Sequence, residues 1–442
     1  MGLFNKFKQS NVLKNIGVSF VFKAVSVVLT FLYVPISRAY LGDLRYGVWA
    51  TISSVVSWIT LSDIGIGYGL RNRLTEALAR GNKKEAQSLV STAYRIMFWI
   101  CALIFLMYYA ISTILDLSVA FNISIEGDNT NLALTITVAF MCINFWLGLV
   151  NTIMYAIQKA AIPAGIGVVN QAINIALVLL ASQKIPVSLP LISIILGGST
   201  FITKSVTTVW VFSKYSFLRP KWSLYEGKYV KAITSFGLML FVSQICSTIM
   251  NSTDNVIISR FFGATNVTPY NTAYRLLQLF ITVNGIIITP MWSAFTLHNE
   301  RKEYTWMKHS LRRMNQINVF LSVAVILMVI VLPFVSDVWL HHHLDYDPLM
   351  LGFMAAYVIA MNYSSNYASV LNGVGDVKLS TFIAGVQALL NIPLSILLAV
   401  RLNMGLAGVI GGTLGVTLIS VIVLPIKVKK WFDEHNENGE TI

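Results

Sequence analysis

The chain of 442 residues is 56% hydrophobic and 12% charged, with a mean hydropathy of +0.69. These totals are typical of an integral membrane protein and exclude a large soluble domain. The formal net charge is +13, but the Lys and Arg residues lie in short segments between apolar runs. We therefore assign the charge to a bilayer interface and expect no nucleic-acid partner.

Apolar segments of about 20 residues, long enough to cross a bilayer as helices, recur along the whole chain. They predict an all-α membrane fold of twelve transmembrane helices, preceded by an amphipathic N-terminus at 1–14. The expected spans lie near 15–40, 45–70, 88–114, 131–157, 161–182, 189–213, 232–260, 268–296, 313–335, 348–372, 378–400 and 405–427.

The orientation of these spans follows from the segments between them. If the N-terminus is cytoplasmic, 23 of the 32 Lys and Arg residues fall on the cytoplasmic side and three on the outside. This bias obeys the positive-inside rule and predicts that both termini are cytoplasmic.

A weak internal repeat divides the spans into two halves. Residues 36–42, Ile-Ser-Arg-Ala-Tyr-Leu-Gly, return at 258–263 as Ile-Ser-Arg-Phe-Phe-Gly, and Asn174 in 173–177 returns as Asn391 in 390–394. The similar offsets predict two six-helix bundles related by a pseudo-twofold axis along the membrane normal. The expected regions are a bundle at 15–213, a cytoplasmic linker at 214–231, a bundle at 232–427 and a tail at 428–442.

The seventh span carries a hydrophilic face that cannot meet lipid. Gln244, Thr248, Asn251, Asn255 and Ser259 recur at spacings of three and four residues. Unpaired polar groups are costly among acyl chains, so this face must meet protein or a water-filled cavity. The first and eighth spans have similar hydrophilic faces, and that of the eighth span includes Gln278. We therefore expect a cavity lined by spans one, two, seven and eight.

Charged residues inside the spans are the candidate functional groups, because each costs about 2.5–3.5 kcal/mol at mid-helix. For Arg38 and Arg260, near span ends, reaching the headgroups is the alternative to a cavity role. Asp254 pairs with Arg275 or Arg260 on one reading and binds a coupling cation or proton on the other. The candidates for binding an anionic substrate are Lys23, Arg38, Arg71, Lys204, Arg260 and Arg275. The candidates for coupling or for polar cavity contacts are Asp63, Asp254, Asn251, Asn255 and Gln278.

Enzyme and metal signatures are missing from the sequence. No P-loop, catalytic triad or dinucleotide-binding motif is present, so we expect a protein that is not an enzyme. His341, His342 and His343 are consecutive and lack partners at ligand spacing, so we expect no metal site there. No cofactor is expected beyond a coupling ion, H⁺ or Na⁺.

Two stretches carry a family resemblance. Residues 63–72, Asp-Ile-Gly-Ile-Gly-Tyr-Gly-Leu-Arg-Asn, and 252–259, Ser-Thr-Asp-Asn-Val-Ile-Ile-Ser, resemble the polysaccharide transport family of O-antigen and capsule-unit flippases. That family lies in the multidrug/oligosaccharidyl-lipid/polysaccharide (MOP) exporter superfamily. The glycines at 65, 67 and 69 also permit close helix packing or a broken helix.

The resemblance implies a bacterial inner-membrane flippase. Its substrate would be an undecaprenyl-diphosphate-linked oligosaccharide, moved to the periplasmic leaflet by alternating access and coupled to an ion gradient. Polysaccharide polymerase and chain-length regulator proteins would be its partners.

Two other functions are weighed against the flippase. A multidrug or cation antiporter of the same superfamily would favour acidic cavity groups, whereas six Lys or Arg residues lie within the spans here against Asp63 and Asp254. A membrane glycosyltransferase or polymerase would need a catalytic loop outside the membrane, and the longest outside loop, 115–130, has no basic residue.

Overall fold

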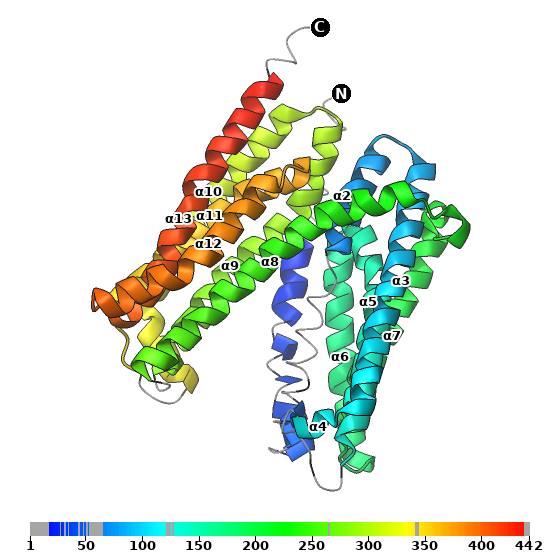
Figure 1. Ribbon diagram of the computed structural model, residues 1–442, viewed down its shortest axis with the longest axis horizontal. Coiled ribbons are helices and arrows are strands. Elements are labelled where there is room, and N and C mark those ends of the chain that lie inside the picture. The colour runs from blue at the N-terminus through cyan, green and yellow to red at the C-terminus, as the bar shows by residue number, and fades with distance from the viewer. Residues whose placement is uncertain are drawn as a thin grey trace. The chain divides into compact units, whose positions relative to one another are not determined.

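The computed structural model describes residues 17–436 apart from 27, 31, 34, 43–44, 47, 50–51, 53–64, 121–124, 126–127, 264–265 and 341–343. Every labelled element within this described part of the chain is helical (Figure 1). The elements are α2 (Ile66–Ala79), α3 (Lys83–Ile114), α4 (Leu117–Ala120), α5 (Thr130–Ala156), α6 (Ala161–Lys184), α7 (Leu189–Lys214), the 3-10 turns η2 (Ser216–Leu218) and η3 (Trp222–Leu224), α8 (Gly227–Phe262), α9 (Val267–Glu300), α10 (Tyr304–Leu340), α11 (Pro348–Val374), α12 (Lys378–Ile396), the π-helical turn η5 (Leu397–Arg401) and α13 (Gly405–Asn436).

Helices of membrane-spanning length dominate the chain. Among the described residues, 10 helices are long and apolar enough to cross a bilayer, beginning with Gly17–Gly42. The helix α11 is 27 residues long, enough to span, but is too polar to belong to that set. The predicted second span, 45–70, includes residues 53–64, which lie outside the described part. The predicted all-α membrane fold is confirmed, and the twelve-span layout fits these helices.

The chain divides into two compact units, Met1–Leu238 and Met239–Ile442. The division lies within α8. The segment 214–231, which we expected to be a linker, packs on α3: Leu218 is fully buried, and the Gln87 amide donates a hydrogen bond to the Arg219 carbonyl at 2.9 Å. These residues therefore belong to the packing of the first unit.

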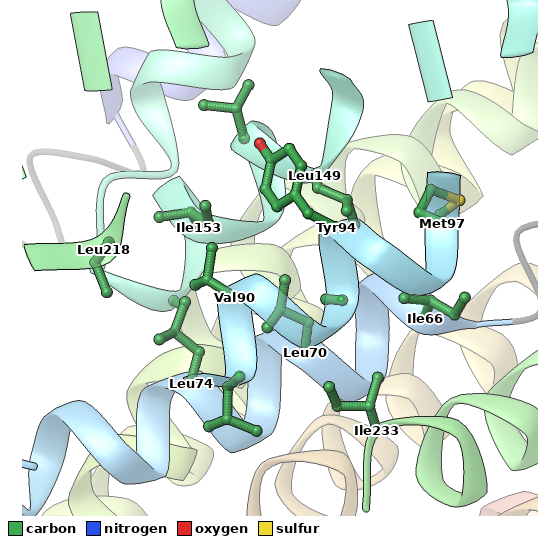
Figure 2. Packing of buried hydrophobic residues seen from close by; sticks show 14 of the residues in the cluster. Ile66, Leu70, Leu74, Val90, Tyr94, Met97, Leu149, Ile153, Leu218 and Ile233 are labelled. Carbon is green, nitrogen blue, oxygen red and sulfur yellow. The ribbon is translucent and has the colours of Figure 1, made fainter. Parts of the chain in front are cut away.

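The core of the first unit forms where α2, α3 and α5 meet (Figure 2). Ile66, Leu70 and Leu74 recur every four residues, so one face of α2 is apolar, and all three are fully buried. Val90 of α3 and Ile153 of α5 pack against that face. Within a bilayer such contacts stabilise mainly through close van der Waals packing, because lipid tails are as apolar as these side chains.

Glycines bring the start of α2 against the backbone at the start of α8. Gly65 has φ +71°, in the left-handed region that favours glycine. A Cβ atom on Gly65 would overlap the Gly237 carbonyl group, and one on Gly69 would overlap the carbonyl oxygen of Ile233. The close helix packing that the glycine-rich stretch permits is therefore present at these two positions.

The second unit is organised around α11, which packs against α9, α10 and α13. Its buried polar residues hydrogen-bond to its neighbours. The Asn284 amide of α9 donates to the Asn362 carbonyl at 3.1 Å, the Asn366 amide donates to Asn315 Oδ1 of α10 at 3.1 Å, and the Asn315 amide donates to the Tyr367 hydroxyl at 2.9 Å. These bonds explain how so polar a helix is held inside the unit.

Candidate functional site

Asp254, in the second unit, is the candidate carboxylate that lies among the described residues, and it is buried. Its side chain is 4% exposed. The Tyr270 hydroxyl of α9 donates to Oδ2 at 2.6 Å, and the Thr413 hydroxyl of α13 lies 3.2 Å from Oδ1. The carboxylate therefore joins three helices, α8, α9 and α13.

Asp254, a candidate for coupling or for polar cavity contacts, does not lie on the polar face of α8. The polar face of α8 is exposed at Gln244 and Thr248, but Asp254 shares the adjacent buried face with Met250 and Ile258. Because one residue turns a helix by about 100°, neighbours in sequence lie on different faces. Asp254 thus faces the interior of the second unit.

The salt bridge considered for Asp254 is not formed. Arg260 and Arg275 are exposed, and neither takes part in an ion pair between described residues. The carboxylate is held instead by uncharged hydroxyl donors. Burying an ionised carboxylate with only neutral donors costs free energy, so the site favours binding of a cation or a proton.

More oxygen atoms gather around Asp254 through α12. The Asn391 amide donates to the Thr413 hydroxyl at 2.8 Å, and the Asn391 Oδ1 is buried with no hydrogen-bond partner among the described residues. A Cβ atom on Gly412 would overlap Ser395, so this glycine lets α13 approach α12 closely. The site combines one carboxylate with hydroxyl and amide oxygens, a donor set suited to a hard cation.

Tyr270, Thr413 and Asn391 were missed by the sequence reasoning as members of this site. The repeat contained one signal: Asn391 corresponds to Asn174 of the first unit. The Asn174 side chain accepts a hydrogen bond from Ser199 on the following helix, as Asn391 bonds Thr413 on the helix after its own. A repeated buried Asn was therefore a sign of a contact between helices in both units.

In the first unit the central candidate is Lys204 on α7. Its ammonium group donates to the Asn144 carbonyl of α5 at 2.8 Å, and it forms no ion pair between described residues. The side chain is half-buried. A lone Lys inside a spanning helix is costly, which makes it a candidate for function.

The other predicted residues fall in varied settings. Arg71 is 5% exposed, and its guanidinium lies 5.1 Å from the Tyr155 ring centre, a cation–π contact inside the first unit. Asn255 is half-buried, and its Oδ1 has no hydrogen-bond partner among the described residues. The exposed side chains are those of Lys23, Arg38, Arg260, Arg275 and Gln278. The side chain of Asn251, and all of Asp63, His341, His342 and His343, lie outside the described residues.

The chain matches two family profiles. A sequence profile described as "Polysaccharide biosynthesis protein" matches residues 12–295, more than half of the chain. The chain belongs to the polysaccharide biosynthesis protein family. The MatE profile also matches this family member, over residues 240–397.

Two curated relatives of this polysaccharide biosynthesis family member carry O-antigen names. A candidate O-antigen transporter of Salmonella typhi is 20% identical over 368 residues, covering 79% of this chain and 80% of that protein. A candidate O-antigen export protein of Yersinia pseudotuberculosis is 35% identical over 71 residues, 16% of each chain.

Solved structures similar to this family member include MATE transporters and transporters named as members of the MOP superfamily. One is an outward-facing multidrug resistance MATE family transporter, with a TM-score of 0.79 at 14% identity over 96% of both chains. The Vibrio cholerae MATE transporter VcmN in its bent form has a TM-score of 0.75 at 14% identity, over 97% of this chain and 99% of that one. A MOP superfamily transporter from Pyrococcus furiosus has a TM-score of 0.76 at 14% identity over 96% of both chains.

These likenesses establish the fold, and the relatives are named as transporters rather than enzymes. This family member is a multi-pass membrane protein with the fold of these MATE structures.

Proposed function

We propose that the protein is a flippase for a lipid-linked oligosaccharide of the O-antigen or capsule type. The substrate would be an undecaprenyl-diphosphate-linked repeat unit, carried from the cytoplasmic to the periplasmic leaflet by alternating access. The family and the names of the two relatives support a polysaccharide-related cargo. In this proposal the membrane is the bacterial inner membrane, both termini are cytoplasmic, and polymerase and chain-length regulator proteins take over the product.

The observation that carries the proposal is the set of cations inside candidate spans that lack acidic partners. Lys23, Lys204, Arg260 and Arg275 lie in such helices, and none forms an ion pair between described residues. A cation kept in a membrane without a counter-ion is costly unless an anionic ligand neutralises it or water solvates it. A diphosphate with acidic sugars supplies that negative charge.

The polarity of the binding pocket differs between transporters of this fold. The Pyrococcus furiosus transporter has a binding pocket of reverse polarity, which suggests a different function for that protein. By the same reasoning, unpaired Lys and Arg residues favour an anionic cargo here, because they would repel a cationic drug.

Asp254 supports a proposal about the energy source. The buried carboxylate, with Tyr270, Thr413 and Asn391 around it, is our candidate for the coupling site that binds Na⁺ or H⁺. Occupation would neutralise the carboxylate and thereby favour one arrangement of α8, α9 and α13. Release of the ion would favour another, because a ligand shifts an equilibrium toward the state that binds it better.

The cargo is tested by deleting the gene in its host and assaying lipid-linked sugars for composition and leaflet. We expect complete repeat units to accumulate on the cytoplasmic side while surface polysaccharide is lost. Normal surface polysaccharide after deletion would reject the proposal.

The coupling site is tested with Asp254→Asn, which keeps the side-chain shape and removes the charge. We expect transport into energised vesicles to lose its dependence on the ion gradient. Asp376→Asn is the matched control, since Asp376 lies beyond the end of α11 and pairs with Lys427 at 2.9 Å. If Asp254→Asn vesicles still respond to the gradient as the wild type does, the coupling ion binds elsewhere. Comparing Na⁺ and pH gradients then distinguishes the two ions.

The rival function is a multidrug or cation antiporter, which the MatE profile match over residues 240–397 favours. The deletion strain distinguishes it directly. Unchanged polysaccharide together with greater sensitivity to cationic drugs would establish the antiporter in place of the flippase.

A further inference from the structure

A cavity of about 750 Å³ opens in the second unit, away from Asp254. It is lined by residues of the first turns of α10, the last turns of α11 and the last turns of α13. By the positive-inside rule this end of the unit faces the cytoplasm. The cavity is therefore placed at the depth of the lipid headgroups rather than at the bilayer centre.

The rim of this cavity is basic. Lys308 and Arg312 line it from α10 and Lys429 lines it from α13, against one carboxylate, Asp433. None of these four residues forms an ion pair between described residues. Asn315 and Tyr367 also line the cavity, and the Asn315 amide donates to the Tyr367 hydroxyl at 2.9 Å. The site thus offers an excess of positive charge, with uncharged polar groups beside it.

From this cavity toward the bilayer centre, α10 and α13 each carry a row of exposed apolar side chains, which we call the apolar stripes. On α10, Val319 and Val323 follow Arg312 and Asn315 at spacings of three and four residues, and they are 64% and 53% exposed. On α13, Leu418 and Ile422 precede Pro425 and Lys429 at the same spacings, and they are 44% and 61% exposed. A soluble anion would contact only the cations. An anionic lipid would contact the cations with its phosphate and would cover these stripes with its acyl chains.

We infer that this cavity is a binding site for an anionic phospholipid. Its phosphate would lie among Lys308, Arg312 and Lys429, and its acyl chains would follow the exposed stripes of α10 and α13. Basic pockets between transmembrane helices on the cytoplasmic side are suited to anionic lipid headgroups. This lipid is not the transported cargo: it would fill the space between α10 and α13 as a lasting component of the second unit.

The chain contains a matched control for this inference. Arg313 follows Arg312, and Lys430 follows Lys429, but neither Arg313 nor Lys430 lines the cavity. All four side chains are exposed. The double variant Arg312→Gln/Lys429→Gln therefore removes the same charge as Arg313→Gln/Lys430→Gln from neighbouring positions.

The test measures binding of dioleoyl phosphatidylglycerol and of dioleoyl phosphatidylcholine to the purified full-length protein by native mass spectrometry. We expect the wild type to bind one phosphatidylglycerol more tightly than phosphatidylcholine. Arg312→Gln/Lys429→Gln should weaken that binding about 30-fold, because each Lys or Arg near a membrane surface strengthens attraction to anionic lipid by about fivefold and this variant removes two. Arg313→Gln/Lys430→Gln should change it less than about threefold.

Three results would overturn the inference. The first is equal weakening in both double variants, which would mean general surface attraction. The second is a wild type that does not prefer phosphatidylglycerol to phosphatidylcholine. The third is loss of undecaprenyl phosphate binding in Arg312→Gln/Lys429→Gln with phosphatidylglycerol binding unchanged, which would assign the cavity to the cargo lipid.

Discussion

Replacing Gly69 by Ala tests the close packing of α2 against the start of α8. Two effects oppose each other. Ala is favoured over Gly inside a helix by about 1 kcal/mol. Its Cβ, however, would overlap the backbone carbonyl oxygen of Ile233, which cannot rotate away as a side chain can. Overpacking costs about 1–3 kcal/mol, and a rigid backbone neighbour places this case at the upper end. We expect a net loss of about 2 kcal/mol.

Gly167→Ala is the matched control, because no atom lies within 4 Å of the Cβ that it would add on α6. We expect that change to be stabilising by about 1 kcal/mol. The two variants should therefore differ by about 3 kcal/mol, or more than 100-fold in the folding equilibrium. The assay is the apparent melting temperature in detergent, followed by fluorescence-detected size-exclusion chromatography. If Gly69→Ala melts at or above the wild-type temperature, α2 and α8 do not pack through this glycine.

Three further predictions concern charged residues. Lys23→Ala should abolish surface polysaccharide while the amount of folded protein stays the same, and normal polysaccharide would end its assignment to the diphosphate. Lys204→Met should stop transport yet leave melting unchanged or raise stability by about 1 kcal/mol, since the ammonium is half-buried with one hydrogen bond to Asn144; a lower melting temperature would mean that Lys204 is structural. Hydrogen bonds, first from the Ser118 hydroxyl, lower the pKa of Asp116 to about 2, so its stabilising effect is complete above about pH 4 and is lost as the pH falls toward 2. Asp116→Asn should remove that part of the pH dependence in acid unfolding curves.

Much of the fold could be predicted from the sequence, because a bilayer imposes strong constraints on an apolar chain. Spanning helices must be about 20 residues long and must satisfy their own backbone hydrogen bonds. The fourth predicted span agrees closely with the structure: we expected it at 131–157, and α5 runs Thr130–Ala156. The ends of α8 and α10 extend further than expected, since polar turns at helix ends carry no hydropathy signal. The expected span 313–335 became Tyr304–Leu340.

The candidate site could be predicted less completely. The charge of Asp254 identified it as a candidate. We expected it on the polar face because its neighbour Asn255 lies four residues after Asn251 and seven after Thr248. A hydropathy pattern does not predict which hydrogen-bond partner a polar side chain will have. Tyr270 and Thr413 are ordinary residues in their helices and become part of a site only through packing between helices far apart in sequence.

The polar character of α11 has a consequence for how the protein is made. The buried Asn366 side chain of α11 hydrogen-bonds Asn315 of α10 and Asn284 of α9. Alone in lipid, α11 would leave that amide without partners and would insert poorly. Its partners α9 and α10 precede it in the chain, and synthesis proceeds from the N-terminus. By the time α11 leaves the ribosome, the two helices that satisfy its amides are already in the membrane. The order of the helices in the chain therefore provides the hydrogen-bond partners of α11 before α11 itself is synthesised.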